Sequence, residues 1–116
     1  MALNTFSDLA AEAMENCKSA ALVAGFAKDS ESLDMGGTGA FAYGQAVNIY
    51  LSLALSRLTD ICNALCRWES SKTQVRNLFG RQAIPMIWDF AENNVFAQAA
   101  GDYQACLCKT RRRATR

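Results

Sequence analysis

An apolar repeat in the middle of the chain constrains the fold more than any other feature of the sequence. Spacings of four and three residues alternate without a break over almost four heptads. The members of the repeat are Ala40, Gly44, Val47, Leu51, Ala54, Leu58, Ile61 and Leu65. This pattern predicts one long central helix, over about residues 38–67, that carries an apolar seam along one side.

The length of this helix raises the question of what covers its seam. At a rise of 1.5 Å per residue, a helix of about 28 residues is about 40 Å long. Shorter helices within a chain of 116 residues cannot cover all of it. Either a second copy of the chain packs on the seam, or the C-terminal helices fold back over it. A homodimer would use Val47, Leu51, Ala54, Leu58, Ile61 and Leu65 as its seam.

The segment before the central helix predicts a first helix and a loop. Thr5 and Asp8 form a capping box, and apolar residues at helical spacing follow as far as Gly25, so we expect a helix over about residues 5–25. Gly25 suits the left-handed position after its last turn. Residues 28–39 are polar and rich in glycine, which indicates a loop that ends on Thr38 as the N-cap of the central helix.

The segment after the central helix predicts further, shorter helices. Ser71 and Gln74 form a second capping box ahead of apolar residues that reach Phe79, and Pro85 fits the first turn of a fourth helix. Residues 96–108 can add a last helix. Because no segment alternates as strands do, the expected fold class is all-α, a small helical bundle with one long central helix and three to four shorter helices.

The charges are nearly balanced but unevenly distributed. The formal net charge is +1, from 12 Lys and Arg residues against 11 Asp and Glu residues, so no overall field draws the chain to nucleic acid. The last six positions hold Arg111, Arg112, Arg113 and Arg116. We expect a single helical domain over residues 1–108 and a basic, disordered tail over residues 109–116. A DNA-binding arm is the alternative function of that tail.

Composition also limits location and chemistry. No run of about 18 apolar residues and no secretion signal occurs, so a cytoplasmic location without a membrane partner is expected. The five cysteines, an odd number, fit reduced side chains, not a disulfide framework. The sequence has no histidine, the commonest general base and metal ligand. Cys62 and Cys66 lie one helical turn apart and make at most half a metal site, so no metal is expected.

The glycine-rich loop is the one segment with a cofactor-like pattern. Gly36, Gly37, Thr38 and Gly39 precede a predicted helix N-terminus, where backbone N–H groups can hold a phosphate. The loop follows no strand and lacks the Lys and the spacing of a Walker loop, which favours a flexible turn. We therefore expect neither a cofactor nor a catalytic residue.

Several stretches of the sequence resemble one family of enzymes. RNLFGRQAIPMIWDFAENNVF at residues 76–96, with the upstream GGTGAFAYGQAVNIYLSLALSRLTD and LCRWESS, is similar to an internal region of large adenine-specific DNA methylases. TFSDLAAEA near the start resembles the segment before the glycine-rich loop of that family. The similarity covers about residues 4–96. After Phe96 it stops, and Asn94-Val95-Phe96-Ala97 stands where the family has a sequence like Asn-Pro-Phe-Ser.

The resemblance implies a fragment that is catalytically silent alone. Such enzymes transfer a methyl group from S-adenosylmethionine to the N6 of adenine, with a glycine-rich cofactor motif and an Asp-Pro-Pro-Tyr motif, and this chain contains neither. The corresponding region would be a helical insert between those motifs, where it would shape either the DNA cleft or the interface with the catalytic domain. Retained DNA contacts would then be Arg67, Arg76 and Arg81 for phosphates, Trp68 for stacking and Gln82 for a base edge.

Two functions therefore follow from the sequence. The first is a stand-alone, non-catalytic structural or interaction module that associates with a second copy of itself. The alternative is an accessory module that keeps the DNA-facing surface of a methylase. In the alternative interpretation these residues serve only the fold: Trp68 and Trp88 pack in the core, and the arginines form ion pairs on the helix surface.

Overall fold

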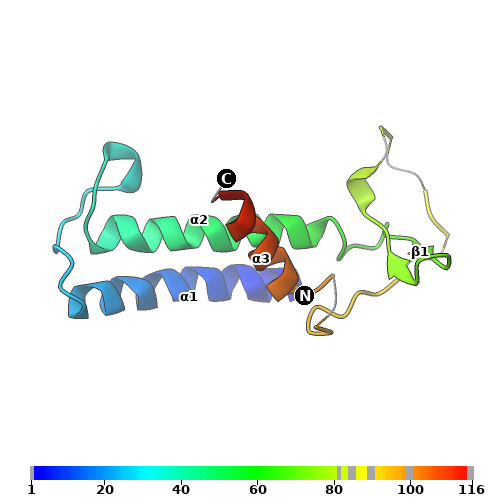
Figure 1. Ribbon diagram of the computed structural model, residues 1–116, viewed down its shortest axis with the longest axis horizontal. Coiled ribbons are helices and arrows are strands. Elements are labelled where there is room, and N and C mark those ends of the chain that lie inside the picture. Colours follow the sequence, from blue (N-terminus) through cyan, green and yellow to red (C-terminus); the bar gives the residue numbers. More distant parts are fainter. Residues whose placement is uncertain (1, 81, 84–85, 89–90, 99–100, 115–116) are drawn as a thin grey trace. The chain divides into compact units, whose positions relative to one another are not determined.

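The computed structural model of the protein describes residues 2–80, 82–83, 86–88, 91–98 and 101–114. Within these ranges the fold is predominantly helical, with a small antiparallel sheet of two strands (Figure 1). The elements are α1 (Ala2–Val23), η1 (Leu33–Met35), α2 (Ala40–Thr59), β1 (Trp68–Glu69), β2 (Gln74–Val75), η2 (Leu78–Gly80) and α3 (Tyr103–Ala114). The helical class is therefore confirmed, but a bundle made only of helices was the wrong expectation.

The chain divides into two compact units, Met1–Leu53 and Ala54–Arg116, and the boundary falls inside α2. We refer to them as the first and the second unit. The single helical domain predicted over residues 1–108 stays a prediction. Among the described residues, none of the helices is both long and apolar enough to cross a membrane.

The first unit is a pair of antiparallel helices, α1 and the part of α2 up to Leu53 (Figure 1). Gly44 allows their backbones to approach closely, because a Cβ there would lie 2.8 Å from Lys18 Cγ and 3.2 Å from the Met14 carbonyl oxygen. Lys18 pairs with Glu15 at 2.7 Å, and its Nζ lies 4.8 Å from the ring centroid of Phe41. α1 begins before Thr5, so the capping box predicted there does not mark its start.

The loop between these helices folds back on the start of α2. Gly25 has the positive φ of 91° expected after the last turn of α1. The Leu33 N–H donates to Gln45 Oε1 at 2.8 Å, which ties the loop to α2. Gly39, whose carbonyl accepts the Tyr43 N–H at 3.0 Å, takes the N-cap position predicted for Thr38.

The central helix is shorter than its apolar repeat predicts, because side chains stop it at Thr59. The Cys62 N–H still donates to the Leu58 carbonyl at 2.9 Å, but Asn63 Nδ2 caps the Thr59 carbonyl at 2.8 Å. Two of the seam positions, Ala54 and Leu58, are 0% exposed within the single chain. A dimer through them would require the covering segments to move, and the seam as a dimer interface stays a prediction.

The third predicted helix is instead a β-hairpin, with Trp68 opposite Val75 and Glu69 opposite Gln74. Such a short hairpin is marginal alone, and further interactions stabilise it. Arg76 Nε lies 2.8 Å from Glu69 Oε2, and the Lys72 N–H donates to the Glu69 carbonyl at 3.2 Å within the turn. The capping-box pattern at Ser71 was therefore a wrong indicator, because aromatic and β-branched cross-strand pairing prevailed.

The last helix, α3, is longer at its C-terminus than predicted. Asp102 starts it, with Oδ1 accepting the Ala105 N–H at 2.6 Å while its carbonyl accepts the Cys106 N–H at 3.2 Å. The helix includes Arg111–Arg113, which the sequence placed in a tail. The fourth predicted helix does not form in residues 86–88, and Pro85, its expected first turn, lies outside the described residues.

Candidate functional site

The β-hairpin of the second unit presents two chemically different faces. The Arg76 N–H donates to the Arg67 carbonyl at 2.9 Å, which extends the pairing by one position and places Arg67 opposite Arg76. Since successive side chains of a strand point to opposite faces, Arg67, Glu69 and Arg76 share one face. Trp68 and Val75 share the other. We call these the arginine face and the tryptophan face.

The arginine face lines a cleft of about 340 Å³ together with Asp60 and Asn77. Asp60 fastens the segment after the hairpin: its carboxylate accepts hydrogen bonds from Asn77 Nδ2 and, at 2.9 Å, from the Phe79 N–H. Glu69 Oε2 is buried, and its negative charge is paired with the Arg76 guanidinium across the hairpin. The cleft is thus lined by two cations, Arg67 and Arg76, and one anion, Asp60, and Glu69, which does not line it, neutralises Arg76 through their ion pair.

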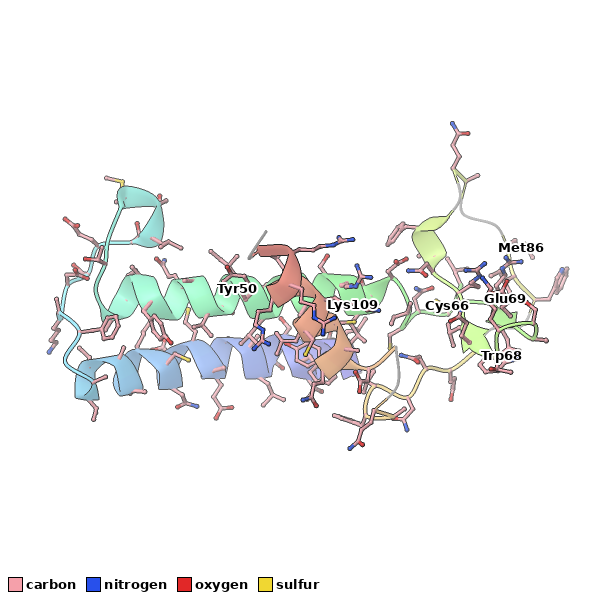
Figure 2. The ribbon with its side chains drawn as sticks, viewed as in Figure 1. Tyr50, Cys66, Trp68, Glu69, Met86 and Lys109 are labelled. Atoms are coloured by element: carbon pink, nitrogen blue, oxygen red, sulfur yellow. The ribbon has the colours of Figure 1, made fainter. Side chains whose placement is uncertain are left out.

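The tryptophan face lines a larger groove, of about 550 Å³. Three cations from separate elements line it: Arg57 of α2, Lys72 of the hairpin turn and Lys109 of α3. Glu92 is the one carboxylate among the described lining residues. Trp68 is 53% exposed here although its cross-strand partner Val75 is half-buried. Figure 2 shows Trp68 on the hairpin and Lys109 on α3 at separate places.

Within the described residues, the cations of this groove form no ion pair with a carboxylate. Across the described ranges, the ion pairs are Lys18 with Glu15 and Arg76 with Glu69, and neither includes Arg57, Lys72 or Lys109. The sequence of the second unit holds ten Lys and Arg residues against five Asp and Glu residues, a net charge of +5. The first unit holds two against six, a net charge of −4. The small total charge therefore hides a strongly basic second unit.

The structure brings together only some of the residues that sequence reasoning selected for DNA contact. Arg67 and Arg76 share the arginine face, Trp68 lies on the opposite face, Gln82 is exposed outside both clefts, and Arg81 lies outside the described residues. The alternative interpretation of the tryptophans as core anchors is wrong, since Trp68 is 53% and Trp88 93% exposed.

Sequence reasoning missed the three groove cations. Arg57, Lys72 and Lys109 are widely separated along the chain and share no motif or periodicity. The fold of the second unit alone makes them neighbours of one groove. An unequal distribution of basic residues between the two halves of the sequence was the only available signal.

The glycine-rich loop does not offer an open phosphate site. The Asp29 carboxylate is packed so closely against Gly39 that a Cβ at Gly39 would overlap Asp29 Oδ1. That oxygen is buried and accepts no hydrogen bond from the described residues. The protein's own carboxylate thus lies at the N-terminus of α2, where a negative charge is favourable.

The cysteines and carboxylates that the structure describes give no second site. No group of three or more Cys, Asp or Glu side chains that could hold a metal ion occurs in the described part of the chain. Burial raises the pKa of the Cys66 thiol and of the Cys106 thiol, so both stay protonated and poorly nucleophilic near neutral pH. All five cysteines are free thiols.

Comparison with known proteins identifies no family or function for these clefts. The resemblance to adenine-specific DNA methylases stays a prediction from the sequence, and the site has to be interpreted from its own chemistry. The chain matches no protein-family model, no curated protein and no solved structure.

Proposed function

We propose that the protein is a non-catalytic, cytoplasmic DNA-binding module whose contact surface is the groove on the tryptophan face. The observation that carries the proposal is the convergence of Arg57, Lys72 and Lys109, without acidic partners in the described structure, around an exposed Trp68. Cations that are left unpaired in this way attract phosphates, which supply most of the affinity of DNA-binding proteins.

The charge distribution supports the same function. The net charge of +5 on the second unit gives a local attraction that the whole-chain value of +1 conceals. The lack of histidine and of methylase cofactor motifs in the sequence favours binding without catalysis. The resemblance to a DNA methylase, as an expectation from the sequence, agrees with a role at DNA.

Neutralisation of the groove tests the proposal. The triple variant Arg57→Gln, Lys72→Gln, Lys109→Gln should bind a labelled oligonucleotide more weakly in fluorescence anisotropy between about 50 and about 200 mM salt. Three lost phosphate contacts should reduce the slope of log K against log salt by about 2 to 3. The matched control Lys28→Gln removes an exposed cation of the first unit and should leave the slope unchanged. An unaltered slope in the triple variant would show that the groove is not the contact surface.

A second candidate function is self-association, and one observation favours it. Tyr43, Ile49, Tyr50 and Leu53 of α2 are exposed apolar residues of the first unit (Tyr50 is labelled in Figure 2). We propose this stripe as the surface to test, because Leu58 of the predicted seam is fully buried and its replacement by Asp would unfold the chain. Light scattering should give a lower mass for Tyr50→Glu, Leu53→Glu than for the native chain. Equal masses would contradict self-association through the stripe.

A further inference from the structure

We infer that the groove binds single-stranded DNA, with one base stacked on Trp68 and the backbone phosphates on Arg57, Lys72 and Lys109. This inference rests on the proposed function and deepens it, since DNA binding by itself does not specify the strand state. The two strand states differ in whether a base face is available to a protein side chain.

The indole of Trp68 is placed for stacking. It is 53% exposed, it lies on the groove side of β1, and its cross-strand neighbour Val75 is a small apolar residue. An exposed aromatic side chain inside a cationic groove is the combination by which proteins bind single strands, since each base has a π-face. Trp88 is 93% exposed but does not line the groove, so exposure alone does not distinguish Trp68.

The arrangement of the cations favours a chain over a compact ligand. Arg57, Lys72 and Lys109 come from α2, the hairpin turn and α3, and Trp68 and Lys109 lie at separate places in the second unit (Figure 2). A backbone with a phosphate at every nucleotide can contact such a series of charges in succession.

The same features disfavour a duplex. In double-stranded DNA the bases are stacked on their neighbours, so an aromatic side chain must unstack them at a cost before it contacts a base face. The described lining of the groove is divided among the last turn of α2, the hairpin and α3, so no single helix supplies it as a reading element for the major groove. A flexible strand meets none of these obstacles.

A fluorescence titration tests the inference with the full chain. In the variant Trp88→Phe, Trp68 is the only tryptophan, and a thymidine oligonucleotide should quench its emission in a saturable way at low salt. In the matched variant Trp68→Phe, Trp88 is the only tryptophan, and its emission should stay constant. The anisotropy of a labelled strand should show that this second variant still binds, because the groove cations and an aromatic ring at position 68 are retained.

A leucine substitution measures the stacking itself. Trp68→Leu keeps an apolar side chain but removes the π-face, and it should weaken single-strand binding by about 5- to 150-fold. A duplex of the same length should bind less tightly than the single strand to the native chain. Circular dichroism of Trp68→Leu shows whether the fold is retained.

The outcomes separate the inference from the proposed function. Tighter binding of the duplex, constant Trp68 emission or unchanged affinity of Trp68→Leu would overturn the single-strand inference and leave DNA binding in place. Absence of binding to both strand states at low salt would overturn both. Quenching of Trp68, together with loss of affinity on leucine substitution, would support the inference.

Discussion

Substitution of Gly37 by alanine should destabilise the first unit, because the loop closes on itself at this residue. Gly37 is buried, and its N–H donates to the Ser32 carbonyl at 3.0 Å. A Cβ at this position would lie 2.5 Å from the Glu31 carbonyl oxygen and 2.9 Å from the Glu31 carbonyl carbon. Both atoms belong to the backbone, so no side-chain rotation can relieve the overlap.

The magnitude follows from the displacement that the new methyl group requires. A contact at 2.5 Å is about 0.9 Å shorter than the 3.4 Å at which ordinary contact begins, so the loop has to move. Inserting one methyl group into such a packed site costs about 1 to 3 kcal/mol. For a chain of 116 residues each kcal/mol lowers Tm by about 4 °C, which gives a decrease of roughly 4 to 12 °C.

Gly80 offers a matched control. A Cβ there would meet nothing within 4 Å, and its φ is not in the left-handed region, so Gly80→Ala should change stability by less than about 0.5 kcal/mol. Thermal unfolding followed by far-UV circular dichroism compares the two variants. Hydrogen exchange at the Leu33 amide, bonded to Gln45 Oε1, should accelerate in Gly37→Ala alone. Equal Tm values for both variants would refute the steric argument.

Two further perturbations test the second unit. Asp60→Ala removes the carboxylate that accepts hydrogen bonds from Asn77 and Phe79, and it should lower the free energy of unfolding by about 1 to 3 kcal/mol. Asp60→Asn keeps one acceptor oxygen and should restore part of this loss. Equal denaturant midpoints for the native chain and both variants would refute this role of Asp60. Burial raises the pKa of the Cys66 and Cys106 thiols above the ordinary value of a free thiol, so the unfolded chain releases these protons first and stability should fall as the pH rises past about 8.5. A free energy of unfolding that stays constant from neutral pH to above about pH 8.5 would contradict this role of the buried thiols.

The apolar periodicity of the sequence predicts where the long helices lie, but it does not predict the residues at which they end. The apolar repeat locates α2, but its end at Thr59 depends on the Asn63 cap and on Asp60, which binds residues 77–79. Strands of two residues, such as Trp68–Glu69, are too short to show any alternation. The capping-box pattern in the same segment, which normally starts a helix, therefore led to the prediction of a helix there.

The candidate site could be predicted only in part, for a related reason. Trp68 was selected as a stacking residue because of the resemblance to DNA methylases, and the structure places it in the groove. Arg57 and Lys109 were not selected, because each reaches the groove through the fold of the second unit and neither belongs to a motif. Arg67 and Arg76 were selected but share another cleft with Asp60, and Arg76 is paired with Glu69.

The opposite charges of the two units have a consequence for the protein in concentrated solution. Near neutral pH the net charge of +1 gives little mutual repulsion between copies, while a unit of −4 on one copy attracts a unit of +5 on another. Added salt screens this attraction within about 10 Å at 0.1 M. The protein should therefore salt in: it should be least soluble in dilute buffer and dissolve as the ionic strength rises, the reverse of a protein whose solubility depends on a uniform charge.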